Sequence, residues 1–305
     1  MITNLEKSPL PFAVTDITSE TYKLTNSYGQ TLHLHSWFGT AQPDKIMVIV
    51  HGMGGHGGYY ATSLAPYIAP VGVALYAPDL RGHGLSEGRR GDIETFNLFQ
   101  DDVATVIRWV RQRHPGLPLF LLGESMGTPI AITYVATAPA DARPDFLALI
   151  ACVVSPTLKP HLDEIFRTLY YLVRDRRRTV IPITGREEEG VRDLEFIKVL
   201  RADELFNRKV SVRFLSSMTL YMQRASRLYL RLTLPVFMAQ GGLDITVRHR
   251  QTRAFFARIA SADKELHYFP EAYHALLNDP DAPQVRQRLL EWMERKTQQY
   301  QATFQ

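Results

Sequence analysis

The sequence is poor in cysteine: Cys152 is the only one among 305 residues. A single thiol can form no intrachain disulfide and cannot supply a zinc site built from cysteines. Its position in an apolar run predicts a role in core packing. A chain without disulfides fits a reducing compartment, so we expect a cytoplasmic protein.

Long hydrophobic runs are also lacking. The most span-like stretch, residues 61–78, is uncharged, but Pro66, Pro70 and Gly72 interrupt it. This pattern predicts a helix, a turn and a strand rather than a membrane span. The first residues carry Glu6 and Lys7 and no continuous apolar segment, which argues against a secretory signal.

A large excess of charge is the third missing feature. There are 35 Lys and Arg against 31 Asp and Glu, a net charge of +4, and 45% of the residues are hydrophobic. This is the composition of a globular protein, and we expect no nucleic-acid partner. The charge is nevertheless uneven, because residues 156–234 hold 16 basic and 10 acidic side chains.

Strand-like and helix-like patterns alternate along most of the chain. Apolar runs predict strands at 46–50, 72–77, 117–122, 146–154, 234–240 and 265–269, after a predicted hairpin of 22–25 with 31–37. Amphipathic helices are predicted between most of these strands, for example around Phe99–Val110. The alternation predicts an α/β fold with a doubly wound, mostly parallel sheet.

The alternation stops after Pro156, and only helical patterns follow to about Arg231. We therefore expect residues 156–234 to form a helical cap inserted into a core made of residues 1–155 and 235–305. The insertion follows the carboxyl end of a predicted strand, which is where open α/β sheets bind ligands.

The strongest local motif is Gly123-Glu124-Ser125-Met126-Gly127. It follows an apolar strand pattern directly and precedes a predicted helix, which is the setting of a nucleophile elbow. In such a turn the serine oxygen is held up at the edge of the sheet. The motif predicts that Ser125 is a catalytic nucleophile.

A serine nucleophile needs a base and an acid that orients the base, in the chain order Ser, Asp or Glu, His. His274 lies just past the last predicted strand and is the expected base, whereas His249 and His267 fall in a helix and a strand pattern. Asp244 follows the strand before that, in a glycine-rich turn, and is the expected acid.

The loop after the strand at 46–50 is rich in glycine, reading HGMGGHGG from His51. Glycines let a backbone amide approach a developing negative charge closely. We expect the amides of Met53 and Met126 to form an oxyanion hole.

Five segments occur in the order and spacing found in α/β-hydrolases: HGMGGHGGYY, DLRGHGLSEG, GESMG, GGLDITV and EAYH. The sequence resembles the monoacylglycerol lipase and lysophospholipase branch in particular, which includes serine aminopeptidase-like members. The resemblance covers about 31–155 and 235–298. It implies a Ser–His–Asp esterase with a helical cap, an acyl-enzyme intermediate and no cofactor. In one departure, Glu124 and Thr128 replace the His and the last Gly of the GHSMGG found in many relatives.

Three other interpretations were weighed. Residues 52–57 also match the dinucleotide fingerprint GxGxxG, with Asp79 at the end of the next strand, but this leaves Ser125, Asp244 and His274 unexplained. His33 and His35 share a strand face and could bind a metal, but no third ligand has suitable spacing, so a solvated face is expected. Asp79 and His83 are expected to shape a loop.

The function predicted from these patterns is hydrolysis of lipid-like carboxylic esters of the monoacylglycerol or lysophospholipid type. A peptidase or amidase, and a hydrolase fold that only binds a ligand, remain alternatives. The basic cap with Arg176, Arg177 and Arg178 suggests contact with anionic lipid surfaces; apolar stripes in the cap suggest an acyl tunnel.

Overall fold

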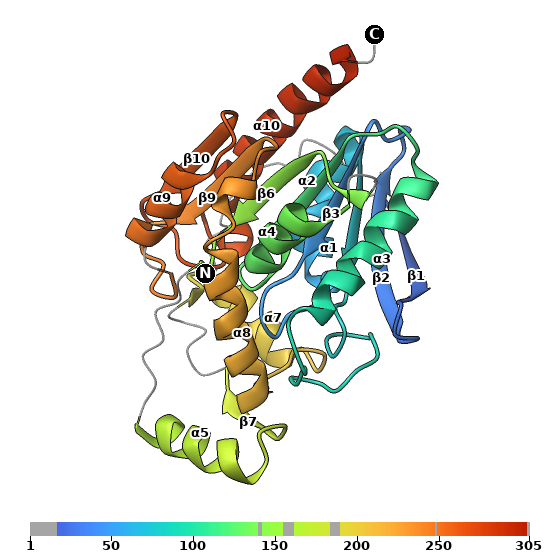
Figure 1. Cartoon of the computed structure of the whole chain (residues 1–305). Helices are drawn as coiled ribbons and strands as arrows, with labels where there is room; N and C mark the ends of the chain where they lie inside the picture. Colours follow the sequence, from blue (N-terminus) through green and yellow to red (C-terminus); the bar gives the residue numbers. More distant parts are fainter. Residues whose placement is uncertain (1–16, 140–141, 155–161, 184–189, 248, 304–305) are drawn as a thin grey trace, which may run out of the picture.

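A computed structural model of the chain describes residues 17–139, 142–154, 162–183, 190–247 and 249–303. Eight strands form one sheet in the order β1-β2-β4-β3-β5-β6-β9-β10 (Figure 1). All neighbouring pairs are parallel except those of β2, which is antiparallel to both β1 and β4. The strands are β1 (Ile17–Thr25), β2 (Thr31–Gly39), β3 (Lys45–Val50), β4 (Val73–Pro78), β5 (Leu119–Glu124), β6 (Phe146–Ile150), β9 (Val236–Gly241) and β10 (Lys264–Phe269).

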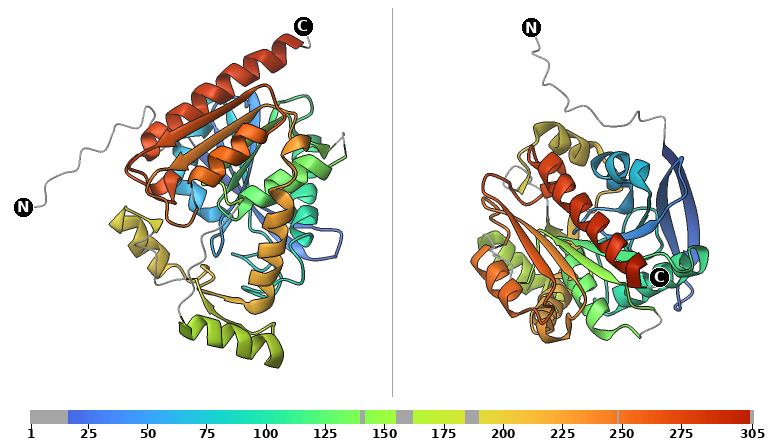
Figure 2. Two further views of the ribbon diagram at one scale, coloured as in Figure 1. Left: turned by 60° about the vertical axis from the view of Figure 1, so that its left-hand side comes forward. Right: turned by 90° about the horizontal axis from the view of Figure 1, so that it is seen from above.

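Helices cover both faces of the sheet (Figure 1 and Figure 2). On β3, for example, Ile46 and Val48 pack into one hydrophobic core and Met47 and Ile49 into another. The first core includes α3 (Leu98–Arg113), α4 (Gly127–Thr137), α8 (Val212–Ala225) and α9 (His249–Arg258). The second includes α1 (Tyr60–Ser63), α2 (Ala65–Ile68) and α10 (Ala282–Thr303). Short 3-10 turns are η2 (Gly57–Tyr59), η3 (Ala69–Val71) and η6 (Leu276–Asn278). The predicted doubly wound, mostly parallel sheet is confirmed.

The stretch at 61–78 forms short helices, a turn and β4, as its prolines and glycine predict. No helix among the described residues has the length and apolar character needed to cross a bilayer.

One strand is shorter than its sequence pattern. The apolar run 146–154 predicts a strand of nine residues, but β6 ends at Ile150. Ala151 adopts a left-handed φ of 51°, which breaks an extended ladder. Residues 152–154 are buried without being part of the sheet.

The segment inserted between β6 and β9 is not purely helical. It contains α5 (Leu162–Arg174), α7 (Leu194–Ala202), α8 and η5 (Tyr229–Arg231), but also β7 (Thr179–Pro182) and β8 (Lys209–Ser211), which pair antiparallel. The sequence pattern did not indicate these two short strands, although the described part of the insertion is mostly helical. The expected boundary at 155–156 lies outside the described residues, and the division into core and cap stays a prediction.

Two helices of the insertion, α8 and α5, differ in whether their apolar faces pack against the core. The apolar face of α8, including Phe214, Met218, Tyr221 and Met222, is buried in the first core. Helix α5 stands away from the sheet in both Figure 1 and Figure 2. The apolar stripe of α8 is thus explained by packing, whereas that of α5 is not.

Candidate active site

Ser125 occupies a strained turn between β5 and α4. Its φ is 50°, a left-handed conformation that costs a non-glycine residue on the order of 1–3 kcal/mol. The flanking glycines have no room for a side chain. A Cβ on Gly123 would lie 2.5 Å from the carbonyl oxygen of Gly127, and one on Gly127 would lie 2.0 Å from that of Val50. The turn has the geometry that the motif predicts.

The structure brings the three predicted polar side chains together. His274 Nε2 lies 2.7 Å from Ser125 Oγ, and His274 Nδ1 lies 2.8 Å from Asp244 Oδ2. Ser125 follows β5, Asp244 follows β9 and His274 follows β10. Because these strands are parallel, their carboxyl ends meet at one edge of the sheet, and residues distant in sequence converge there.

The second oxygen of Asp244 fixes its carboxylate. Asp244 Oδ1 accepts hydrogen bonds from the amides of Thr246 and Val247, at 2.8 and 3.0 Å. Oδ2, which faces His274, also accepts from Gln240 Nε2 at 2.8 Å. These bonds leave the carboxylate a single orientation.

Charges at the site favour an ionised acid beside a basic imidazole. Burial acts to raise the pKa of Asp244, but His274 and the hydrogen-bond donors outweigh burial, so the pKa is lowered. Burial acts to lower the pKa of His274, but Asp244 and Glu124 outweigh it and raise the pKa above its usual 6.5. The arrangement stabilises the imidazolium that forms when His274 takes a proton.

The residues whose amides are expected to form the oxyanion hole lie next to, or follow, residues near the nucleophile. Gly52 lies against the nucleophile, since a Cβ there would be 3.3 Å from Ser125 Cβ, and Met53 follows it. Met126 begins the turn into α4. Within the described ranges, neither the Met53 amide nor the Met126 amide donates a hydrogen bond, so both can receive a ligand oxygen.

The two departures from the relatives' GHSMGG pattern both make contacts. Thr128 Oγ1 donates to the carbonyl oxygen of Ser125 at 2.7 Å and accepts from the Val153 amide at 2.9 Å. Glu124 Oε2 accepts from the Tyr60 hydroxyl at 2.6 Å. The sequence marked both positions as unusual, but the partner of Glu124 is 64 residues away and no local pattern announces it.

The glycine-rich loop does not function as a dinucleotide fingerprint. Asp79, which would bind a ribose, is fully buried. Its carboxylate accepts the amides of Gly57 and Leu85, at 2.7 and 2.8 Å. A Cβ on Gly57 would lie 2.2 Å from the carbonyl oxygen of Ala77, so this glycine serves close packing. Asp79 shapes the loop, as expected.

The strand face carrying His33 and His35 is half-buried, so the expectation of a solvated face is wrong. The two rings lie in an edge contact, with centroids 4.5 Å apart. His35 also lies 3.2 Å from Asp79 through its Nε2. The strand thus packs against the loop that begins at Asp79.

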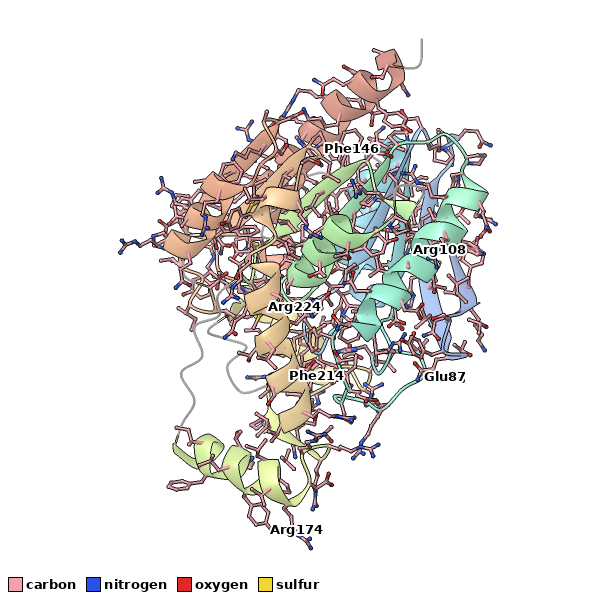
Figure 3. All side chains as sticks on the ribbon, in the orientation of Figure 1. Glu87, Arg108, Phe146, Arg174, Phe214 and Arg224 are labelled. Atoms are coloured by element: carbon pink, nitrogen blue, oxygen red, sulfur yellow. The ribbon has the colours of Figure 1, made fainter. Side chains whose placement is uncertain are left out.

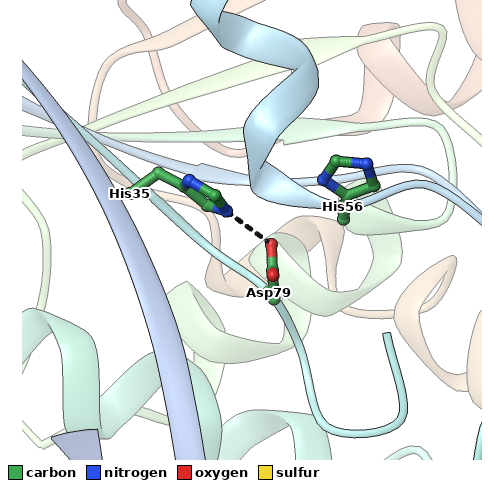
Figure 4. A group of neighbouring side chains, drawn as sticks. All are labelled: His35, His56 and Asp79. Atoms are coloured by element: carbon green, nitrogen blue, oxygen red, sulfur yellow. Dashed lines mark ion pairs between the residues drawn. The ribbon is translucent and has the colours of Figure 1, made fainter. Parts of the chain in front are cut away.

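His35, His56 and Asp79 form the cluster with the most metal-like arrangement among the described residues (Figure 4). Their potential ligand atoms lie within 4.8 Å of one another. However, both ring nitrogens of His56 are engaged: Nδ1 accepts the Gly58 amide at 3.1 Å, and Nε2 lies 2.9 Å from Asp203 Oδ2. A metal that bound His56 would have to break its hydrogen bond to Gly58 or to Asp203. We therefore interpret the cluster as one that stabilises the packing of the loop.

The remaining candidates lie apart from the triad. His249 begins α9, and His267 in β10 lies 3.2 Å from Glu265. Cys152 is fully buried, and burial raises the pKa of its thiol to about 12. It is a core residue, as expected.

Comparison with known proteins agrees with this geometry. The family model described as serine aminopeptidase, S33 matches residues 41–281. The monoglyceride lipase of Rattus norvegicus is 30% identical over 272 residues, covering 88% of this chain and 86% of that protein. The monoacylglycerol lipase of Mycolicibacterium smegmatis is 27% identical over 259 residues, covering 84% of this chain and 90% of that protein.

A solved structure shows the same fold. It is a soluble variant of monoglyceride lipase from Saccharomyces cerevisiae in complex with a substrate analog, with a TM-score of 0.78 at 20% identity, covering 96% of this chain and 99% of the other. The α/β-hydrolase fold and the lipase-like branch predicted from the five motifs are thus confirmed, and the chain belongs to the serine aminopeptidase, S33 family.

Proposed function

We propose that this protein is a carboxylic ester hydrolase that cleaves lipid-like esters of the monoacylglycerol or lysophospholipid type. The observation that carries the proposal is the continuous contact from Ser125 through His274 to Asp244, with distances of 2.7 and 2.8 Å. Two relatives with 30% and 27% identity are lipases of monoacylglycerols by name, which supports the substrate class.

The proposed mechanism assigns one role to each group. Ser125 Oγ attacks the ester carbonyl while His274 Nε2 takes its proton, and Asp244 holds the imidazole in the productive tautomer. The amides of Met53 and Met126 stabilise the oxyanion. His274 then gives the proton to the leaving alcohol. Water, deprotonated by His274, attacks the acyl-enzyme; the bond from the acyl carbon to Ser125 Oγ breaks, His274 returns the proton to Ser125 Oγ, and the carboxylic acid leaves.

An active-site-directed fluorophosphonate tests the enzyme against a fold that only binds ligands. We expect covalent labelling of the wild-type protein, mapped to Ser125 by peptide mass spectrometry. A protein that stays unlabelled, or is labelled at another serine, would favour a hydrolase fold that only binds a ligand.

The substrate class is tested with the same preparation, which is assayed with monoacylglycerols, lysophospholipids, nitrophenyl esters of graded length and aminoacyl naphthylamides. We expect the esters to be preferred; preference for the naphthylamides would favour the aminopeptidase alternative, which the family description suggests.

We further propose that α5 and the turn after it dock on anionic lipid surfaces. The helix exposes large apolar side chains, with Phe166 at 70% and Val173 at 89% exposure. Arg174, Arg176 and Arg177 follow them and are exposed too, and Arg174 lies at the end of α5 far from the sheet (Figure 3). An exposed apolar face beside positive charge suits the boundary between acyl chains and anionic headgroups.

Flotation with vesicles that contain anionic lipid tests this surface. We expect binding at low salt that falls toward physiological salt. Each Arg near such a surface contributes about 1 kcal/mol, so changing Arg176, Arg177 and Arg178 to Gln should weaken binding by roughly two orders of magnitude. The matched control changes Arg108, Arg250 and Arg253, which are exposed on α3 and α9, and should bind nearly as well as wild type. Equal binding by both variants, or no binding at low salt, would contradict the proposal.

A further inference from the structure

Glu124 is an acidic side chain beside the nucleophile that the proposed mechanism does not use. It is the last residue of β5, so its backbone leads directly into the strained turn of Ser125. Its carboxylate accepts a hydrogen bond from the hydroxyl of Tyr60, at 2.6 Å, and Tyr60 itself is only 2% exposed in the second hydrophobic core. Because the core fixes Tyr60, its hydrogen bond gives the carboxylate of Glu124 a defined place next to the site.

In this pair the Tyr60 hydroxyl is the donor and the Glu124 side chain is the acceptor. Burial and the neighbouring carboxylate raise the pKa of Tyr60 well above 10, so its hydroxyl remains a donor. Burial raises the pKa of Glu124, while the Tyr60 hydrogen bond and the nearby His274 act to lower it. The Tyr60 hydroxyl therefore favours the carboxylate form, because that hydrogen bond is stronger to a charged acceptor.

Glu124 immediately precedes Ser125, whose Oγ lies 2.7 Å from His274 Nε2, so two acidic side chains, Asp244 and Glu124, belong to the surroundings of His274. Asp244 contacts its Nδ1 directly, and Glu124 acts on it from the end of β5. The next charged group along the His274 loop, Asp279, is paired with Arg192 at 2.6 Å. The two acids differ in role, since Asp244 sets the tautomer by a hydrogen bond whereas Glu124 acts through its field.

We propose that Glu124, held by Tyr60, is a positioning residue that stabilises the protonated form of His274 during acyl transfer. The inference rests on the proposed hydrolase function. When Ser125 attacks, its proton moves to His274 Nε2, and the imidazolium that forms is hydrogen-bonded to Asp244 and lies in the field of Glu124. A nearby negative charge lowers the energy of that cation.

The pH profile of kcat/KM distinguishes this role from a structural one. His274 must be neutral to act as a base, so activity falls as the pH drops below its raised pKa. In Glu124→Gln, which keeps an acceptor for Tyr60, one acid that raises this pKa is gone. We expect the acid limb to move to lower pH by roughly one unit and the plateau of kcat to fall about tenfold, with KM little changed.

Tyr60→Phe is the second variant. Without its hydrogen bond Glu124 ionises less readily, so the acid limb should move in the same direction, and adding Glu124→Gln should move it no further. Glu195→Gln is the matched control, because Glu195 is exposed on α7 and, among the described residues, its carboxylate pairs with Lys198 alone. Its profile should equal that of wild type.

An acid limb that stays in place in both Glu124→Gln and Tyr60→Phe would overturn the inference, and so would a loss of rate that is uniform with pH. Fluorophosphonate labelling separates this outcome from failure of the proposed function. If Ser125 of the wild type is labelled while the variants keep the wild-type pH profile of kcat/KM, Glu124 does not stabilise protonated His274 and the hydrolase assignment survives. If Ser125 is not labelled, the hydrolase assignment fails first.

Discussion

Ser125→Ala is expected to lower kcat on a nitrophenyl ester by a factor on the order of 10⁴ or more, with the protein still folded. The substitution removes the oxygen that forms the acyl-enzyme. His274→Ala should cost a similar factor, because Ser125 then lacks the acceptor that now lies 2.7 Å away. Since the two act as one unit, the double variant should be scarcely slower than either single variant.

Stopped-flow or end-point hydrolysis measures kcat, and thermal unfolding checks the fold. Ser226→Ala is a suitable control, because the Ser226 hydroxyl donates to the carbonyl oxygen of Gln223 in the inserted segment and makes no other hydrogen bond within the described part of the chain. It should hydrolyse the ester at the wild-type rate. A Ser125→Ala or His274→Ala protein within roughly tenfold of wild type would end the triad assignment.

Asp244→Asn should reduce kcat by about 10⁴ through the tautomer of His274. Two backbone amides donate to Asp244 Oδ1, so the amide oxygen of an asparagine must take that place. Its NH₂ group then faces His274 Nδ1 and donates to it. His274 would carry its proton on Nε2 and could not accept one from Ser125.

The fold should tolerate this change. Gln240 now donates to Asp244, and its Oε1 has no partner among the residues that the structure describes. Turning the Gln240 amide over lets Oε1 accept from the new NH₂ group. Asp145→Asn is the control. Asp145 is also a carboxylate that accepts a backbone amide, that of Leu119, but it lies at the opposite end of β5 from Ser125. Near-normal activity in Asp244→Asn would place the acid elsewhere.

The sequence predicted the sheet well because buried parallel strands are short apolar runs between helices. The prediction was wrong where an apolar run continues beyond the end of a strand, and it missed strands too short to show a pattern. The run 146–154 is apolar throughout, and only the backbone turn at Ala151 shows that the strand stops. Strands β7 and β8 have four and three residues in a basic segment, too few for a period-two pattern to emerge.

The positions of the three triad residues were predictable for a topological reason. Each stands just after a predicted strand, and the ends of parallel strands converge. Features that depend on long-range packing were not accessible. The Tyr60–Glu124 bond joins residues that are 64 positions apart in the sequence. The different environments of Phe166 and Phe214, one exposed and one buried, follow from where the helices pack rather than from their periodicity.

The contacts of the loop at 52–58 restrict which segments of this enzyme can be exchanged with those of a relative. The backbone N–H of Asn207, in the inserted segment, donates to the carbonyl oxygen of Gly54 at 2.9 Å. The carboxylate of Asp203, in the same segment, is hydrogen-bonded to His56 Nε2. A Cβ on Gly54 would lie 2.9 Å from the carbonyl oxygen of Asn207.

The loop beside Ser125 is therefore shaped by both halves of the molecule. A chimaera that took residues 156–234 from a relative would also disturb the loop. To transfer substrate preference between relatives, a graft would have to carry the insertion and the loop as one unit, with the Asp203–His56 and Asn207–Gly54 pairs kept together.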